Sequence, residues 1–138
     1  MTCNKHILTF TVAMILSLPS WGQSFESLIS KADSLKSKYG QYDDRYLNAL
    51  TDAIQVPFQN GDYKTAYNLR KQHCELVKTK FGEESREYAE DIFRLGNVVK
   101  GLYGDGTAVK NYIKAYEILQ TVGGNLDFQD AALTNLTQ

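Results

Sequence analysis

Cysteine and histidine, which often act as nucleophiles and metal ligands, are scarce in this chain, with two of each among 138 residues. One of each lies in the first 23 residues, which we expect to be removed, so Cys74 and His73 are left. A single cysteine cannot form an intramolecular disulfide, so stability must come from helix packing. Adjacent side chains on a helix point about 100° apart, so these two cannot bind one metal ion without a third group. We expect a packed thiol beside a half-exposed imidazole.

An excess of positive charge is also absent. The chain has 15 basic and 16 acidic residues, and losing Lys5 with the first 23 residues leaves 14 against 16, a net charge of about −2. No basic stripe remains that would attract nucleic acid. The glycines at 101–106 follow no strand and precede no Gly-Lys-Ser/Thr, so they predict a flexible turn between helices and no phosphate loop. We therefore expect neither a nucleic-acid partner nor a cofactor.

Long apolar runs are missing as well, apart from one near the start. Residues 1–23 have a positively charged beginning, an uncharged run at 7–18 and then small residues, the pattern of a secretory signal peptide. We expect cleavage after Gly22 or Gln23. The alternative, a permanent anchor, needs about 20 apolar residues, and this run has 12. The sequence predicts an exported protein, periplasmic or extracellular, with no stable membrane span after cleavage.

What the rest of the chain does have is apolar residues at the spacing of one helix face. Pro57 is expected to stop or kink the second helix, because proline lacks the N–H. Short connections make neighbouring helices antiparallel. The sequence predicts an all-α fold with six helices, at about 24–38, 44–56, 63–80, 86–100, 107–122 and 128–138.

A second periodicity relates residues that are 42 positions apart. It begins with Gly40 and Gly82 and with Tyr46 and Tyr88, and continues with the pairs Ala66 and Ala108, Glu75 and Glu117, Leu76 and Ile118, and Gly82 and Gly124. Small residues recur where helices must cross closely, and large apolar residues recur where they interdigitate. Such repetition is typical of stacked helical units.

Within the repeat, the residues resemble the tetratricopeptide family. The first helix of that family's pattern is matched by Ile92, Leu95-Gly96 and Val99, and the second by Ala108, Tyr112 and Ala115. Residues 81–89 look like the longer kinesin-light-chain type of repeat, and residues 104–115 lean towards Sel1-like repeats.

The resemblance covers residues 24–138 and implies antiparallel helix pairs stacked as a short right-handed α-solenoid, about two and a half units long. We expect the chain to end inside a unit, as a truncated array would. Pro57, Arg70 and His73 depart from the family's pattern. We expect looser packing around them.

The resemblance also implies a non-enzymatic module that binds a protein or peptide on a concave surface built from the first helix of each pair. Amide side chains there can bond a peptide backbone, Arg94 or Lys100 a carboxylate, and Phe93 would be an apolar anchor. An ordinary solvated helix face is the alternative. The residues expected on this surface are Asn48, Thr51, Asp52, Gln55, Glu90, Phe93, Arg94, Asn97 and Lys100.

The sequence raises a second hypothesis about function. In this alternative, the chain is the N-terminal repeat segment of a larger sensor, regulator or protease-like protein whose effector domain is absent here. An independent enzyme is not expected, because the sequence suggests no nucleophile, base and orienting group that assemble in one place.

Overall fold

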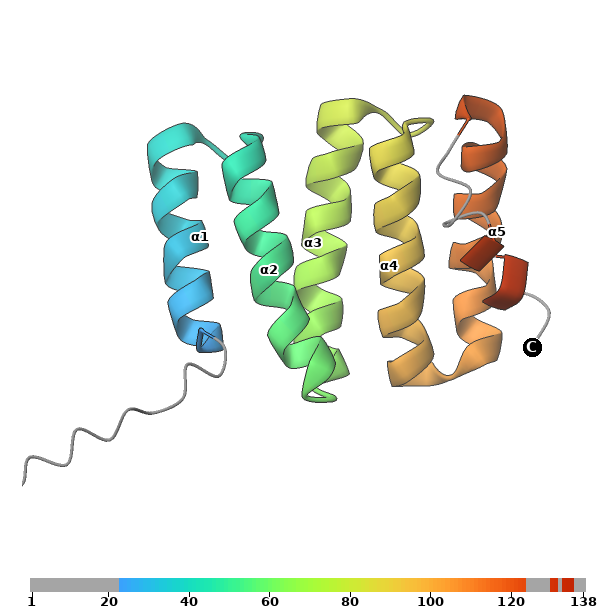
Figure 1. Ribbon diagram of the computed structural model, residues 1–138, viewed down its shortest axis with the longest axis horizontal. Coiled ribbons are helices and arrows are strands. Elements are labelled where there is room, and N and C mark those ends of the chain that lie inside the picture. Colours follow the sequence, from blue (N-terminus) through green and yellow to red (C-terminus); the bar gives the residue numbers. More distant parts are fainter. Residues whose placement is uncertain (1–22, 124–129, 132, 136–138) are drawn as a thin grey trace, which may run out of the picture.

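The computed structural model describes residues 23–123, 130–131 and 133–135. Five helices stand side by side in one row, each running opposite to the one before it (Figure 1). Over the described residues no strand occurs, which confirms the all-α prediction. The helices are α1 (Phe25–Tyr39), α2 (Asp44–Gln59), α3 (Tyr63–Phe81), α4 (Arg86–Tyr103) and α5 (Asp105–Val122).

Two predicted segments fall largely beyond this part of the chain. Residues 1–22, which carry the signal-peptide prediction, lie outside the described residues. Of the helix predicted at 128–138, residues 130–131 and 133–135 are helical, and the others are not described. Among the described residues, no helix combines the length and the apolar character that a membrane span requires.

The first four helices begin at residues whose side chains accept a hydrogen bond from a free backbone N–H. Ser24, Asp43, Asp62 and Ser85 accept from N–H groups two or three residues further on, at 3.2, 2.9, 3.2 and 3.2 Å. Short polar side chains are the preferred N-caps because those first N–H groups have no partner within the helix. The predicted helix starts at 44 and 86 are therefore confirmed.

Of the two outcomes predicted for Pro57, a stop or a kink, the stop does not occur, because α2 continues to Gln59. It ends instead in a turn closed by two hydrogen bonds. The Asp62 N–H donates to the carbonyl of Pro57 at 2.8 Å, and the Gly61 N–H donates to the carbonyl of Phe58 at 3.2 Å. Gly61 takes φ 76°, the left-handed conformation that glycine adopts at little cost at such helix ends.

The predicted flexible turn at 101–106 is also wrong. Helix α4 runs to Tyr103 and α5 begins at Asp105, so Gly104 alone joins them, with φ 88°. Gly101 lies inside α4 under the ring of Tyr63, where an added Cβ would meet the ring Cε1 at 2.5 Å. The glycine at this position serves helix packing, not chain flexibility.

The 42-residue periodicity is present in the structure. Helices α2 and α4 begin 42 residues apart, and so do α3 and α5. Gly40 and Gly82 have φ 93° and 98°, and their N–H groups donate to the carbonyls of Lys36 and Lys78 at 2.8 and 2.9 Å. We therefore call α2–α3 the first repeat and α4–α5 the second. Helix α5 ends at Val122, as predicted, and its C-cap is Gly123.

The core follows this row of helices as two neighbouring clusters. In the second repeat, Ala108, Tyr112 and Ala115 are each at most 1% exposed. Gly96 lets α5 approach closely, since an added Cβ would lie 2.7 Å from Cε1 of Tyr112. Cys74 is packed in the same cluster, as expected, and burial raises the pKa of its thiol.

Candidate functional site

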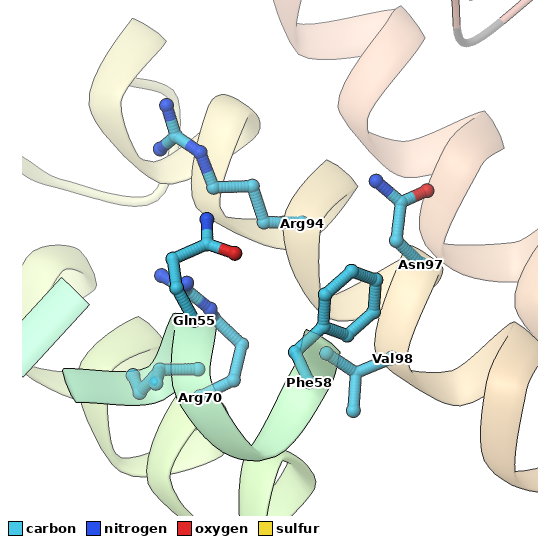
Figure 2. A pocket seen from close by; sticks show the side chains of 7 residues that line it. Gln55, Phe58, Arg70, Arg94, Asn97 and Val98 are labelled. Atoms are coloured by element: carbon cyan, nitrogen blue, oxygen red, sulfur yellow. The ribbon is translucent and has the colours of Figure 1, made fainter. Parts of the chain in front are cut away.

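Two adjoining hollows lie between α2 and α4, with α3 beneath them. We call the larger one the central groove; it has a volume of about 290 Å³ and is lined by Asp44, Leu47, Asn48, Thr51, His73, Val77, Phe81, Glu87, Glu90, Asp91 and Arg94. We call the smaller one the arginine pocket. It has a volume of about 50 Å³ and is lined by Ile54, Gln55, Phe58, Arg70, Arg94, Asn97 and Val98 (Figure 2).

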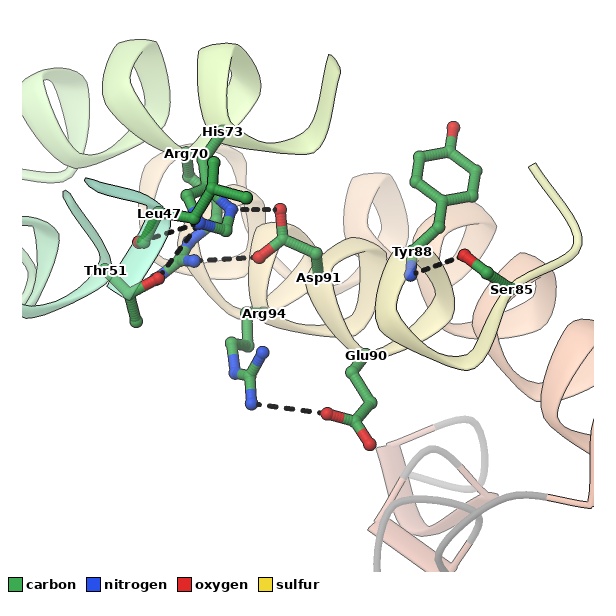
Figure 3. A network of polar contacts seen from close by, with 9 residues as sticks. All are labelled: Leu47, Thr51, Arg70, His73, Ser85, Tyr88, Glu90, Asp91 and Arg94. Carbon is green, nitrogen blue, oxygen red and sulfur yellow. Dashed lines mark hydrogen bonds and ion pairs between the residues drawn. The ribbon is translucent and has the colours of Figure 1, made fainter. Parts of the chain in front are cut away.

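A buried ionic network forms the floor beneath the groove (Figure 3). Arg70 Nη1 donates to Asp91 Oδ1 at 2.8 Å, and His73 Nδ1 lies 2.7 Å from Asp91 Oδ2. On its other side, His73 Nε2 lies 3.1 Å from the Thr51 hydroxyl and 3.1 Å from the Leu47 carbonyl oxygen. These contacts connect α2, α3 and α4.

Water is largely excluded from this network. The side chains of Arg70, His73 and Asp91 are 3%, 6% and 1% exposed. Burial by itself would raise the pKa of Asp91, but the hydrogen bond with His73 and the charges of His73 and Arg70 hold it below its ordinary value. The carboxylate is therefore the charged partner that permits two basic side chains to lie in the core.

Thr51, His73 and Asp91 form a hydroxyl–imidazole–carboxylate chain, which the sequence analysis did not foresee. In hydrolases such a chain lets the imidazole take the hydroxyl proton. Here the carboxylate is shared with Arg70, and Nε2 lies against the Leu47 carbonyl oxygen as closely as against the hydroxyl. A carbonyl oxygen only accepts hydrogen bonds, which favours an N–H at Nε2 and leaves no base. The geometry fits a link between helices better than a general base.

Most of the residues predicted for the binding surface do meet between α2 and α4. Asn48, Thr51 and Glu90 line the central groove, Gln55 and Asn97 line the arginine pocket, and Arg94 lines both. The Asn97 amide is oriented by the Tyr112 hydroxyl, which donates to its Oδ1 at 2.9 Å.

Three predicted residues lie elsewhere. Phe93 is only 7% exposed and packs against Tyr112 with the ring centroids 5.4 Å apart, so it belongs to the core and is not a surface anchor. Asp52 is exposed in a hollow between α1 and α2. Lys100 pairs with Asp105 at 2.9 Å across the junction of α4 and α5.

Sequence reasoning missed the network itself. His73 is 5% exposed, so the prediction of a half-exposed imidazole is wrong. Asp91 holds both Arg70 and His73 in the core. A signal was available, since the 42-residue offset aligns Arg70 with Tyr112 and His73 with Ala115. Basic residues at core positions require a buried acid nearby.

Charge is distributed unevenly along the groove. Asp44, Glu87 and Glu90 lie towards the starts of α2 and α4, whereas Arg94 and Arg70 lie further along. Some of these charges have partners, since Lys80 donates to Asp44 and Arg94 lies 3.6 Å from Glu90. The acidic side chains of the central groove thus lie towards the starts of α2 and α4, and Arg94 lies at its other end, next to the arginine pocket.

Among the described residues, no group of three or more His, Cys, Asp and Glu side chains is arranged to hold a metal ion. A scan of the sequence against protein-family models gave no match, and a search of curated proteins gave no significant match. The site is therefore interpreted from its own geometry.

Proposed function

We propose that the protein is a non-enzymatic binding module of tetratricopeptide-like architecture, whose central groove holds an extended segment of a protein or peptide partner. The observation that carries this proposal is the convergence of Asn48, Thr51, Gln55, Glu90, Arg94 and Asn97 on two adjoining hollows between α2 and α4.

The chemistry of this surface suits a peptide. Asn48 and Gln55 are exposed amides that can both donate to and accept from a peptide backbone. The charged ends of the groove would select the direction and side chains of the bound segment. Beneath them, the buried network of Arg70, His73 and Asp91 holds the flanking helices in register, so the surface is preorganised, which lowers the cost of ordering on binding.

The 42-residue repeat also supports stacking of the helix pairs as an α-solenoid, because each repeat buries its apolar face against the next. With this architecture we propose export through a signal peptide to a periplasmic or extracellular location. The partner is then a protein or peptide met outside the cytoplasm.

A selection from a displayed peptide library tests the proposal. Peptides selected by the purified protein should bind it saturably, and Arg94→Glu should abolish that binding without changing the helical content measured by circular dichroism. Lys71→Glu is the matched control, since Lys71 is exposed and lines a separate hollow shared with α5. If both variants lose binding equally, or if neither variant loses binding, the peptides do not bind in the groove.

A further inference from the structure

Arg70 has a buried donor, Nε, that no described residue satisfies. Its Nη1 is bonded to Asp91, but its Nε has no hydrogen-bond partner among the described residues. The side chain is only 3% exposed. A buried donor without a partner costs about 1–3 kcal/mol, so such a group requires an explanation.

Arg70 lines the arginine pocket together with three other side chains that carry donors. Arg94 contributes a second guanidinium group, and Gln55 lies between the two arginines (Figure 2). Because Asn97 Oδ1 accepts from the Tyr112 hydroxyl, its amide nitrogen is left to donate, and it lies on the side nearer Arg94 (Figure 2). None of the seven lining residues is acidic.

The size and shape of the pocket restrict what it can hold. A volume of about 50 Å³ is enough for more than one water-sized group but for little else. Guanidinium groups bind planar anions with two oxygens especially well, because the N–H donors match the two oxygens in geometry and charge. A carboxylate is small enough for this volume and has two oxygens in one plane.

We propose that the arginine pocket is a carboxylate-binding site, in which Arg70 Nε and the Arg94 guanidinium hold an acidic side chain or the C-terminal carboxylate of the bound segment. This inference rests on the proposed function, because the segment lies in the central groove. A positively charged part of the same segment then binds near Glu87 and Glu90 in the central groove.

The Nε–H resonance of Arg70 in the ¹⁵N-labelled protein gives a direct test with small probes. Sodium acetate should shift it saturably, whereas acetamide, and sodium chloride at equal ionic strength, should not. Arg94→Gln should weaken acetate binding about tenfold, the effect of losing one charge-assisted hydrogen bond. Lys71→Gln, which removes one positive charge outside the pocket, should leave acetate binding unchanged.

Several results would overturn the inference. A resonance that acetate does not shift would mean that a carboxylate does not reach Nε. An equal saturable shift with chloride or inorganic phosphate would exclude selectivity for carboxylates, and equal acetate affinity in Arg94→Gln would exclude the second guanidinium. The acetate titration requires no peptide, so its outcome is independent of the peptide selection. If acetate does not bind but peptides are selected, only the carboxylate site is disproved. If acetate binds but no peptide is selected, only the peptide groove is disproved.

Discussion

The second helices of the two repeats, α3 and α5, bury opposite chemistry at equivalent positions. In α5, Tyr112 and Ala115 are 1% and 0% exposed and pack in an apolar cluster. The residues 42 positions earlier, Arg70 and His73, are 2% and 5% exposed and are held by Asp91. At these two positions, the second repeat therefore relies on apolar packing and the first on ion pairs with one carboxylate.

This difference distinguishes core positions that serve stability from core positions that serve function. A buried ion pair costs desolvation energy that apolar packing does not, and replacing such pairs by apolar residues often leaves stability unchanged or raised. Tyr112 fills its site and bonds Asn97, whereas Arg70 lines a pocket and its Nε has no partner among the described residues. The polar residues of the first repeat line the hollows between α2 and α4, which supports a role in binding.

The largest expected effect comes from breaking the polar core. Asp91→Ala should lower the free energy of unfolding by about 3–5 kcal/mol, because it leaves the charge of Arg70 buried without a counterion. Urea denaturation followed by circular dichroism measures this loss. A change below about 1 kcal/mol would mean that the carboxylate does not hold the first repeat together.

A triple variant sharpens the same comparison by making the first repeat resemble the second. Arg70→Tyr and His73→Ala copy Tyr112 and Ala115, and Asp91→Ala removes the acid that is then unpaired. We expect the triple variant to recover most of the stability lost in Asp91→Ala alone, while losing acetate binding. If it is no more stable than the single variant, apolar packing cannot replace the ion pairs at these positions, where Ile54 stands in place of Gly96.

A smaller loss is expected at the helix crossing of the second repeat. Gly96→Ala puts a Cβ within 2.7 Å of the Tyr112 ring, and such overpacking costs about 1–3 kcal/mol. Gly106→Ala is the matched control, because its Cβ would meet nothing within 4 Å in a helix, where alanine is favoured over glycine. The thermal midpoint should fall for the first variant and stay level or rise for the second.

Acid should weaken the first repeat in a way that the apolar core cannot show. The pKa of Asp91 is lowered in the folded state, so the stability it contributes is fully present above the carboxyl's ordinary pKa of about 3.9. That contribution is lost as the pH falls through the lowered value. The gap in unfolding free energy between the wild type and Asp91→Asn should therefore narrow below about pH 4. A gap that stays constant down to pH 2 would contradict the charged state of Asp91.

The smallest effect is expected on the surface of the second repeat. Lys114 Nζ lies 3.0 Å from Glu83 Oε1, with both side chains about half exposed. Exposed ion pairs contribute about 0–1 kcal/mol, so Lys114→Gln should change the urea midpoint very little. A loss as large as that of Asp91→Ala would remove the contrast between buried and exposed pairs.

Features that depend on neighbouring residues could be predicted from the sequence. The helix starts at 44 and 86 are local features, and the 42-residue offset relates α2 to α4 and α3 to α5. Asp91 could not be predicted in the same way, because its importance depends on Arg70, 21 residues away. No local pattern encodes that contact.

The wrong predictions for Phe93 and for the glycines near 101 have the same cause. Phe93 has polar neighbours in sequence, but α5 covers it. The glycines near 101 resemble a loop by composition, yet the ring of Tyr63 packs on Gly101 and the helix continues. In both cases another helix decides how a residue is used, and the sequence of the residue's own helix does not show it.

The shared helix geometry raises a question of pairing that Asp91 answers. Helices α2 and α4 start at the same repeat position and follow the same type of glycine turn, so either one has the shape to lie against α3. Only α4 presents a carboxylate to Arg70, because α2 has Ala49 at the equivalent position. Asp91 therefore gives α4 a specific place beside α3, distinct from that of α2, which meets the same network through Thr51 and the Leu47 carbonyl.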